Sequence, residues 1–188
     1  PNIGHQKIGN LNQGWEKVLR RFVEKGGGVL LVHHAVGYGG DSDANALFPE
    51  IGQGVDWVQI KAMNVADPNH PVINAEARIR RFPTMSKDPA FAHVHRQSAM
   101  AAGESHMTGF PDYISLKTGP AGKVVVRSAV QGGKGGDATV VAGECGAGRV
   151  VLSGMDIGAD AKKVDGKWKV EEKLSKIEEN LLINAVYW

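Results

Sequence analysis

Cysteine is almost absent from this sequence, because Cys145 is the only one among 188 residues. A single cysteine cannot close a disulfide within the chain, and it rules out a zinc site built from several thiolates. Long hydrophobic runs are also missing, since no apolar stretch reaches the roughly 18 residues that a membrane-spanning helix needs. The sequence therefore predicts neither a disulfide framework nor a membrane span.

An excess of charge of one sign is missing as well. The chain carries 22 Lys and Arg against 20 Asp and Glu, which gives a formal net charge of +2. The densest basic cluster, Arg78–Arg81, alternates as expected for the solvent-facing side of a strand. No basic stripe with interleaved aromatic residues is present, so the sequence predicts no nucleic-acid partner. The compartment stays open, because a chain that starts at Pro1 gives no information on a signal peptide.

Glycine, in contrast, is abundant. The 25 glycines among 188 residues make up about 13% of the chain, against about 7% in an average protein. Many of them stand in pairs and triplets between apolar runs, which indicates short turns rather than disorder. The length suits a single domain, 1–188, with a core of its own.

The first clear structural pattern combines a helix, a turn and a strand. Residues 11–25 carry apolar side chains at helical spacing, with charged residues on the opposite face. Gly26 can take the left-handed conformation that ends a helix. The run 29–32 is continuously apolar, as in a strand that is buried on both faces of a parallel sheet. This order of elements is typical of an α/β fold.

The end of the chain repeats this design. Residues 149–153 indicate a second buried strand, and an apolar stripe from Leu174 to Trp188 predicts a long final helix. Four short β-type runs lie between the two units, at 55–63, 113–116, 123–130 and 138–144. The last of them is expected to form a hairpin with 149–153. The predicted fold is therefore α/β, with a mainly parallel sheet flanked by helices and an antiparallel extension toward the C-terminus.

Three stretches form a recognisable pattern. Residues 22–35 (FVEKGGGVLLVHHA) combine a helix end, a glycine triplet, a buried strand and a histidine. Residues 146–154 (GAGRVVLSG) lead to a final helix that ends in 181–188 (LLINAVYW), and a shorter segment is 67–72 (DPNHPV). In this order the stretches resemble the ThuA-like (trehalose-utilisation) family, with its GxGRV, LLxNAxxW and DPxHPI segments. The resemblance covers about half of the chain.

The resemblance implies a flavodoxin-like fold of the class I glutamine amidotransferase type and a carbohydrate or sugar derivative as ligand. The sequence predicts no cofactor, apart from a possible divalent metal. The resemblance also implies that the N-terminal strands of the family's domain are missing, because the chain starts just before the helix at 11–25. The strand at 29–32 would then expose an edge, so we expect a protein partner or a further chain segment to cover it. Residues 32–34 occupy the place of the catalytic cysteine, and we therefore expect no glutamine amidotransferase activity.

Candidate ligand-binding residues follow the strand at 29–32. Ligands of open α/β sheets bind beyond the carboxyl ends of the parallel strands, which is where His33 and His34 are expected. By the resemblance His33 takes the family's histidine position, and a neutral imidazole there can act as a general base or bind a sugar hydroxyl. The alternative for both is a histidine packed at a strand end. Gly37 and Tyr38 begin a glycine-rich loop whose N–H groups could approach an anion.

Asp156 and Cys145 are the remaining residues whose side chains could take part in catalysis. Asp156 comes directly after the strand at 149–153, so its carboxylate could orient His33, although it could equally cap the following turn. Cys145 falls in the expected hairpin turn rather than at a strand-to-helix elbow. A nucleophilic cysteine needs such an elbow and a histidine base in reach, so Cys145 is interpreted as a structural or incidental thiol.

The histidines in the middle of the chain form the one cluster that could hold a metal. His93 and His95 are two residues apart, so on a strand they would project from the same face, with His106 and Glu104 close by in the sequence. This spacing matches no known metal motif, and a loop that happens to contain polar histidines is the simpler interpretation.

Three functions remain open from the sequence. The first is a ThuA-like domain that binds or modifies a sugar in a crevice near His33, with His33 and Asp156 as catalytic residues. The second is a non-catalytic interaction or scaffold module with the same fold. The third is a metal-dependent hydrolase that uses His93 and His95.

Overall fold

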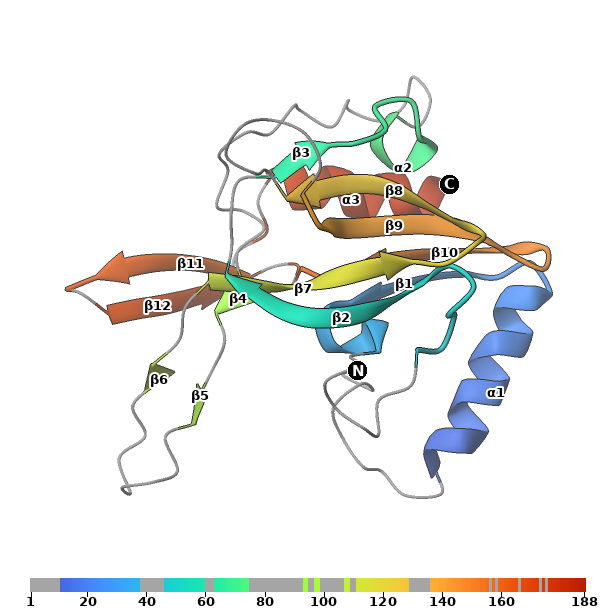
Figure 1. Cartoon of the computed structure of the whole chain (residues 1–188), viewed down its shortest axis with the longest axis horizontal. Coiled ribbons are helices and arrows are strands. Elements are labelled where there is room, and N and C mark those ends of the chain that lie inside the picture. Colours follow the sequence, from blue (N-terminus) through green and yellow to red (C-terminus); the bar gives the residue numbers. More distant parts are fainter. Residues whose placement is uncertain are drawn as a thin grey trace.

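The structure is a computed structural model that describes most of the chain (Figure 1). The described residues are 11–37, 46–59, 63–74, 93–94, 97–98, 107–108, 111–128, 136–155, 157, 159–165, 167–172, 174 and 176–188. Within these ranges, no helix combines the length and the apolar character needed to cross a membrane.

One large sheet organises the described part of the chain. It contains eight strands, and its main path runs β1-β10-β9-β7-β2, with β8 and β3 branching from β9 and β4 pairing with β7. The bounds of these strands are β1 Gly28–Val32, β2 Gly52–Gln59, β3 Met63–Val65, β4 His93–Val94, β7 Pro111–Thr118, β8 Gly122–Ser128, β9 Ala138–Cys145 and β10 Gly148–Ser153. Two small hairpins complete the strands: β5 Gln97–Ser98 with β6 Met107–Thr108, and β11 Ala159–Val164 with β12 Lys167–Glu172.

The sheet is mixed, which corrects the expectation of a mainly parallel one. Among the described pairings, β1 with β10 is parallel and every other pair is antiparallel. A continuous apolar run indicates a strand that is buried on both faces, but it does not specify the direction of the neighbouring strands. Here helices on both faces of the sheet bury antiparallel strands as well. In this part of the chain β1 pairs with β10 alone, so its other edge has no described partner strand.

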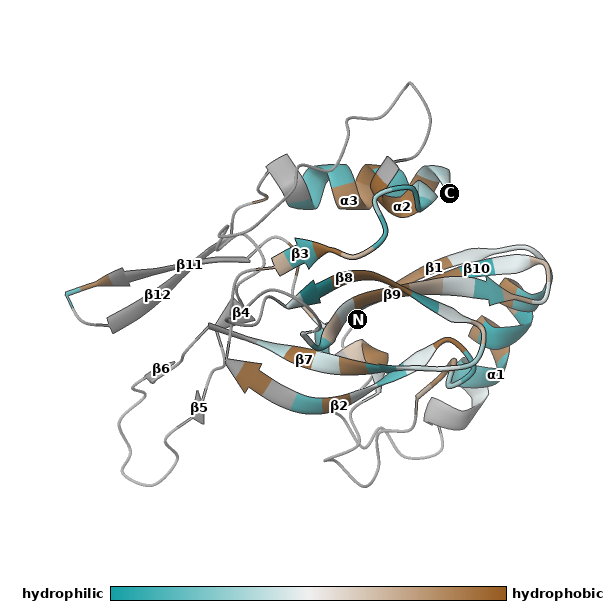
Figure 2. Cartoon of the chain, turned by 45° about the horizontal axis from the view of Figure 1, so that its top comes forward, coloured by the Kyte–Doolittle hydropathy of each residue, from teal (hydrophilic) through white to brown (hydrophobic). Residues whose placement is uncertain are grey.

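Helices cover both faces of the sheet (Figure 1). Helix α1 (Leu11–Glu24) packs on one face through Val23, in a core cluster that also holds Leu31 and Leu152. Helices α2 (Pro71–Asn74) and α3 (Lys176–Tyr187) pack together on the other face, where Leu181 meets Val151. Neighbouring residues of β10 thus enter opposite clusters, as the two-residue period of a strand requires. Figure 2 shows hydrophobic residues along central strands such as β8 and β9.

The GAGRV segment forms a tight turn against the end of α1. Gly146 has a φ of 61°, and the N–H of Ala147 donates a 3.0 Å hydrogen bond to the carbonyl of Glu24. A Cβ on Gly148 would collide with the backbone carbonyls of Val23 and Gly27. Glycine is therefore required at both positions, for its left-handed conformation at one and for close backbone approach at the other.

Several sequence-based boundaries are confirmed. The helix expected at 11–25 is α1, the strands expected at 29–32 and 149–153 are β1 and β10, and the hairpin of β9 with β10 is present. The final helix is shorter than expected, since α3 begins at Lys176 and Leu174 lies outside it. The hairpin β11–β12 was missed, because its mixed Lys, Ala and Val composition gives no clear alternation.

Candidate functional site

His33 stands at the sharpest backbone turn of the candidate site. Strand β1 ends at Val32, and His33 begins the short 3-10 helix η1 (His33–Val36) with a φ of 47°. Non-glycine residues rarely adopt this left-handed conformation, and such outliers concentrate at functional sites. The side chain is buried, with 4% of its surface exposed. His33 thus lies at the carboxyl end of a strand, as predicted, but β1 stands at the end of the described strand path and not in its centre.

Gly37 closes the turn that begins at His33. It is buried and has a φ of 76°, and its carbonyl accepts a 2.6 Å hydrogen bond from the N–H of Gly54 on β2. Ala35 and Val36, between the two, belong to the core cluster under α1. Two contacts therefore stabilise the turn that follows His33: the core packing of Ala35 and Val36, and the backbone hydrogen bond between Gly37 and β2. His33 thus lies on a rigid segment.

The end of β10 lies directly beside this turn. The parallel register pairs Val32 with Ser153, so Gly154 follows at the level of His33. The hydroxyl of Ser153 donates to the carbonyl of Met155 at 3.1 Å, which fixes the bend after β10. Gly154 is clamped further, because its N–H donates to Thr139 and its carbonyl accepts from Ile114, each at 2.8 Å. Backbone groups and small side chains therefore lie beside His33 at this end of the sheet.

A second polar group lies at the same end of the sheet and was not predicted. The hydroxyl of Tyr113 donates to Oδ2 of Asp137 at 3.3 Å, and the N–H of Ser128 donates to the carbonyl of Asp137 at 2.9 Å. Burial raises the pKa of Tyr113 to about 12, and the Asp137 carboxylate acts in the same direction. Tyr113 therefore stays a neutral hydrogen-bond donor at physiological pH. The contact depends on strand pairing, and no sequence signal marks it.

Several candidate residues lie outside what the structure describes. Asp156 and Tyr38, which the sequence placed beside His33, are outside the described residues, and for His34 only the backbone in η1 is described. The proposed pair of His33 and Asp156 therefore remains a prediction.

The same holds for the candidate metal cluster. His95, His106 and Glu104 are outside the described residues, whereas the backbone of His93 forms β4 and pairs with Asp112. Among the residues that the structure describes, no group of three His, Cys, Asp or Glu side chains is placed to hold a metal ion. The metal-site hypothesis remains a prediction, and no described geometry adds to it.

Cys145 lies in a different environment at the far end of the sheet. It is the last residue of β9 and pairs with Gly148, at the start of β10, whereas His33 lies beyond the end of β10. The thiol donates to Oε1 of Glu50 at 3.2 Å, and the same carboxylate oxygen accepts a 2.8 Å hydrogen bond from Arg20 on α1. Burial, followed by the Glu50 hydrogen bond, raises the pKa of Cys145 to about 11.

This arrangement makes Cys145 part of a structural contact. Nη1 of Arg20 also donates to the carbonyl of Leu47 at 2.6 Å, and its guanidinium stacks over the ring of Phe48 at 5.3 Å. The contact joins α1, the segment before β2 and the end of β9. A buried thiol that donates a hydrogen bond to a carboxylate is a poor nucleophile, which agrees with the interpretation of Cys145 as a structural thiol.

Comparison with known proteins identifies the fold. No protein-family model matches the chain, and no curated protein matches it significantly. The structure is similar to that of a ThuA-like protein from Bacteroides uniformis, with a TM-score of 0.52 and 15% identity, over 92% of this chain and 62% of that one. It is also similar to a β-galactosidase from Bacillus circulans sp. alkalophilus, with a TM-score of 0.52 and 8% identity, over 93% of this chain and 20% of that one.

These similarities define the architecture. The chain spans less than two thirds of the length of either protein. At such low identity the likeness concerns the fold alone, and it agrees with the α/β arrangement of a sheet with helices on both faces. The fold of this chain is similar to that of a ThuA-like protein.

Proposed function

We propose that this chain is a ThuA-like domain that binds or modifies a carbohydrate or sugar derivative beside His33. The observation that carries the proposal is the left-handed turn at His33, which follows strand β1 in a fold similar to that of a ThuA-like protein. A conformation of this kind costs about 1–3 kcal/mol, and core packing together with the Gly37–Gly54 hydrogen bond maintains it here.

The chemistry available at this turn suits a neutral, hydroxyl-rich ligand. A neutral imidazole can accept a hydrogen bond from a sugar hydroxyl or withdraw its proton. Ser153 and Gly154 place small residues beside the turn, and the hydroxyl of Tyr113, at the same end of the sheet, already donates to Asp137. Such a set lacks the concentrated positive charge that a phosphate ligand would call for.

The test is calorimetry with glucose, galactose, trehalose and lactose on the wild type and on His33→Ala. We expect binding of at least one sugar by the wild type and a loss of about tenfold or more in His33→Ala, with a similar melting temperature. A matched control is His70→Gln, because His70 is a buried histidine that packs with the α2–α3 layer on the other face of the sheet. This control should lower the melting temperature and leave sugar affinity within about twofold.

Two outcomes contradict the proposal. If none of the four sugars binds the wild type, the chain is not a sugar-binding domain of this type. If His33→Ala unfolds the protein without a selective effect on binding, then His33 is a packed histidine, and the scaffold alternative is favoured.

A further inference from the structure

Helix α1 exposes large apolar side chains although it is part of a packed layer. Trp15, Val18 and Phe22 have 56%, 71% and 54% of their surfaces exposed, whereas Val23 on the same helix is fully buried. The helix therefore contacts the sheet with one side only. The ring of Phe22 lies where a Cβ on Gly27 would be, so the exposed apolar stripe is fixed in place and reaches the start of β1.

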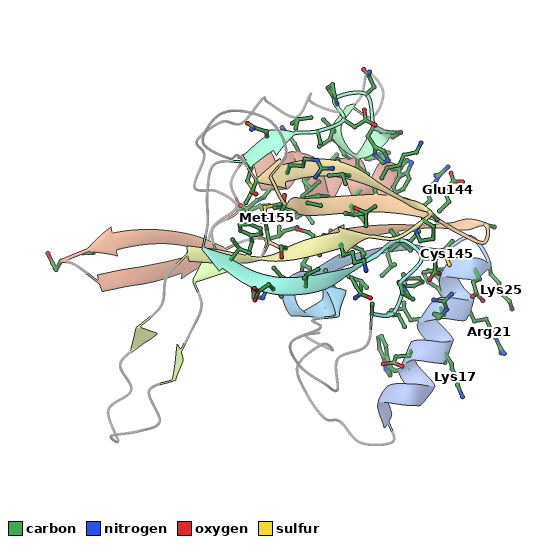
Figure 3. The ribbon with its side chains drawn as sticks, in the orientation of Figure 1. Lys17, Arg21, Lys25, Glu144, Cys145 and Met155 are labelled. Atoms are coloured by element: carbon green, nitrogen blue, oxygen red, sulfur yellow. The ribbon has the colours of Figure 1, made fainter. Side chains whose placement is uncertain are left out.

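A row of positive charge runs along this stripe. Lys17, Arg21 and Lys25 follow each other at four-residue spacing, and their side chains project outward from α1 (Figure 3). The N–H of Lys25 donates to the carbonyl of Arg21 at 3.2 Å, which continues the helical pattern to the third cation. All three are exposed, and among the described residues none of them forms an ion pair. Like charges at this spacing repel each other and destabilise a helix.

The two rows enclose a shallow groove. Its volume is about 400 Å³, and it is lined by Lys17, Val18, Arg21, Phe22 and Lys25. Exposed apolar surface and a row of like charges are each unfavourable in an isolated chain. Both become favourable against a partner that brings apolar side chains and carboxylates together.

We propose that this face of α1 binds an acidic amphipathic helix of a partner protein. Carboxylates at positions i, i+4 and i+8 of such a helix repeat at the spacing of Lys17, Arg21 and Lys25, so each cation meets one of them. Apolar residues on the neighbouring row enter the groove beside Val18 and Phe22. The site is separate from the turn at His33, and the inference does not depend on sugar binding.

Two other occupants fit the surface less well. A second copy of the chain that docked through the same face would bring two rows of cations together, which is repulsive in a twofold contact. An anionic membrane would match the charge and the exposed apolar side chains, but it is flat, whereas this face of α1 carries a groove of about 400 Å³. A groove also fits protruding side chains better than a planar headgroup surface.

The probe is a synthetic helical peptide with glutamates at i, i+4 and i+8 and leucines on the adjacent row, and its binding is followed by fluorescence anisotropy. We expect saturable binding that weakens with rising salt and that falls about tenfold or more in Arg21→Glu. This variant replaces the repulsive pairs with Lys17 and Lys25 by attractive ones, so loss of helix structure would not explain the effect. Val18→Ser should weaken binding as well, and the matched control Lys123→Glu, an exposed charge change on β8, should not.

Three results would overturn the proposal. The first is equal binding of the peptide and of a version with lysine in place of glutamate. The second is binding of vesicles of phosphatidylcholine and phosphatidylserine that depends on Arg21 and excludes the peptide, because it would assign the surface to a membrane. The third is a concentration-dependent dimer that Arg21→Glu abolishes or strengthens, because it would assign the face to a second copy.

Discussion

The imidazole of His70 lies edge to face on the indole of Trp188, with ring centroids 4.9 Å apart and an interplanar angle of 66°. Arg149 also lies against this indole, with its guanidinium 5.6 Å from the ring centroid. Nearby, Nδ2 of Asn184 donates to the carbonyl of Ile73 at 3.2 Å. The DPNHPV, GAGRV and LLINAVYW segments therefore meet around one tryptophan, which gives a physical reason for their joint occurrence.

His70 should make stability depend on pH. Burial lowers its pKa below the usual value, partly opposed by the charge of Asp67 and supported by that of Lys123. The unfolded chain thus takes up the proton more readily, so the stabilisation is complete above about pH 6.5 and is lost as the pH falls from there through the folded-state pKa. Urea unfolding between about pH 8 and about pH 5 should show this decline, and His70→Gln should flatten it. An unchanged slope in His70→Gln would contradict the prediction.

The glycine turn offers a test with an internal control. Gly148→Ala places a methyl group against the carbonyls of Val23 and Gly27, and we expect a loss of about 1–3 kcal/mol in unfolding free energy. Gly14→Ala, in the open interior of α1, has no atom within 4 Å of the new Cβ. That variant should gain up to about 1 kcal/mol from helix propensity. Equal effects of the two substitutions in chemical denaturation would show that the turn does not pack as described.

Local sequence patterns predicted several helices and strands, whereas the order and direction of the strands in the sheet depend on non-local pairing. The helix α1, the strand β1 and the hairpin at Gly146–Gly148 were predictable because each depends on residues adjacent in the sequence. The antiparallel pairing of β2 with β7 was not, since an apolar run does not specify its neighbour or its direction. His33 was placed correctly at a strand end for the same local reason. The contact of Tyr113 with Asp137 was not predictable from the sequence, because it forms only after the strands have paired.

The left-handed conformation at His33 can be tested through glycine and alanine. An L-residue in this region costs about 1–2 kcal/mol relative to its usual conformation, whereas glycine adopts it freely. Both His33→Gly and His33→Ala remove the imidazole, so the difference between their free energies of unfolding measures the cost of the left-handed backbone conformation. We expect His33→Gly to be more stable than His33→Ala by about 1 kcal/mol in urea unfolding. A more stable alanine variant would show that the backbone at His33 is not left-handed in solution.

Cys145 is expected to support no glutaminase chemistry. It pairs with Gly148 at the start of β10, six residues before Gly154, and at about 3.3 Å per residue this is roughly 20 Å from the level of His33. With a pKa of about 11, which burial and Glu50 cause, only roughly three thiols in ten thousand are ionised near pH 7.5.

The chain should therefore release no ammonia from glutamine, and native Cys145 should react with iodoacetamide far more slowly than the same thiol in urea. Glu50→Gln removes the charge that opposes thiolate formation, so it should speed up alkylation, although burial will keep the rate below that of the unfolded chain. Both rates can be followed by mass spectrometry on the intact protein. Ammonia release that disappears in Cys145→Ala would mean that a second, reactive environment of this thiol exists, and the structural interpretation of Cys145 would then be wrong.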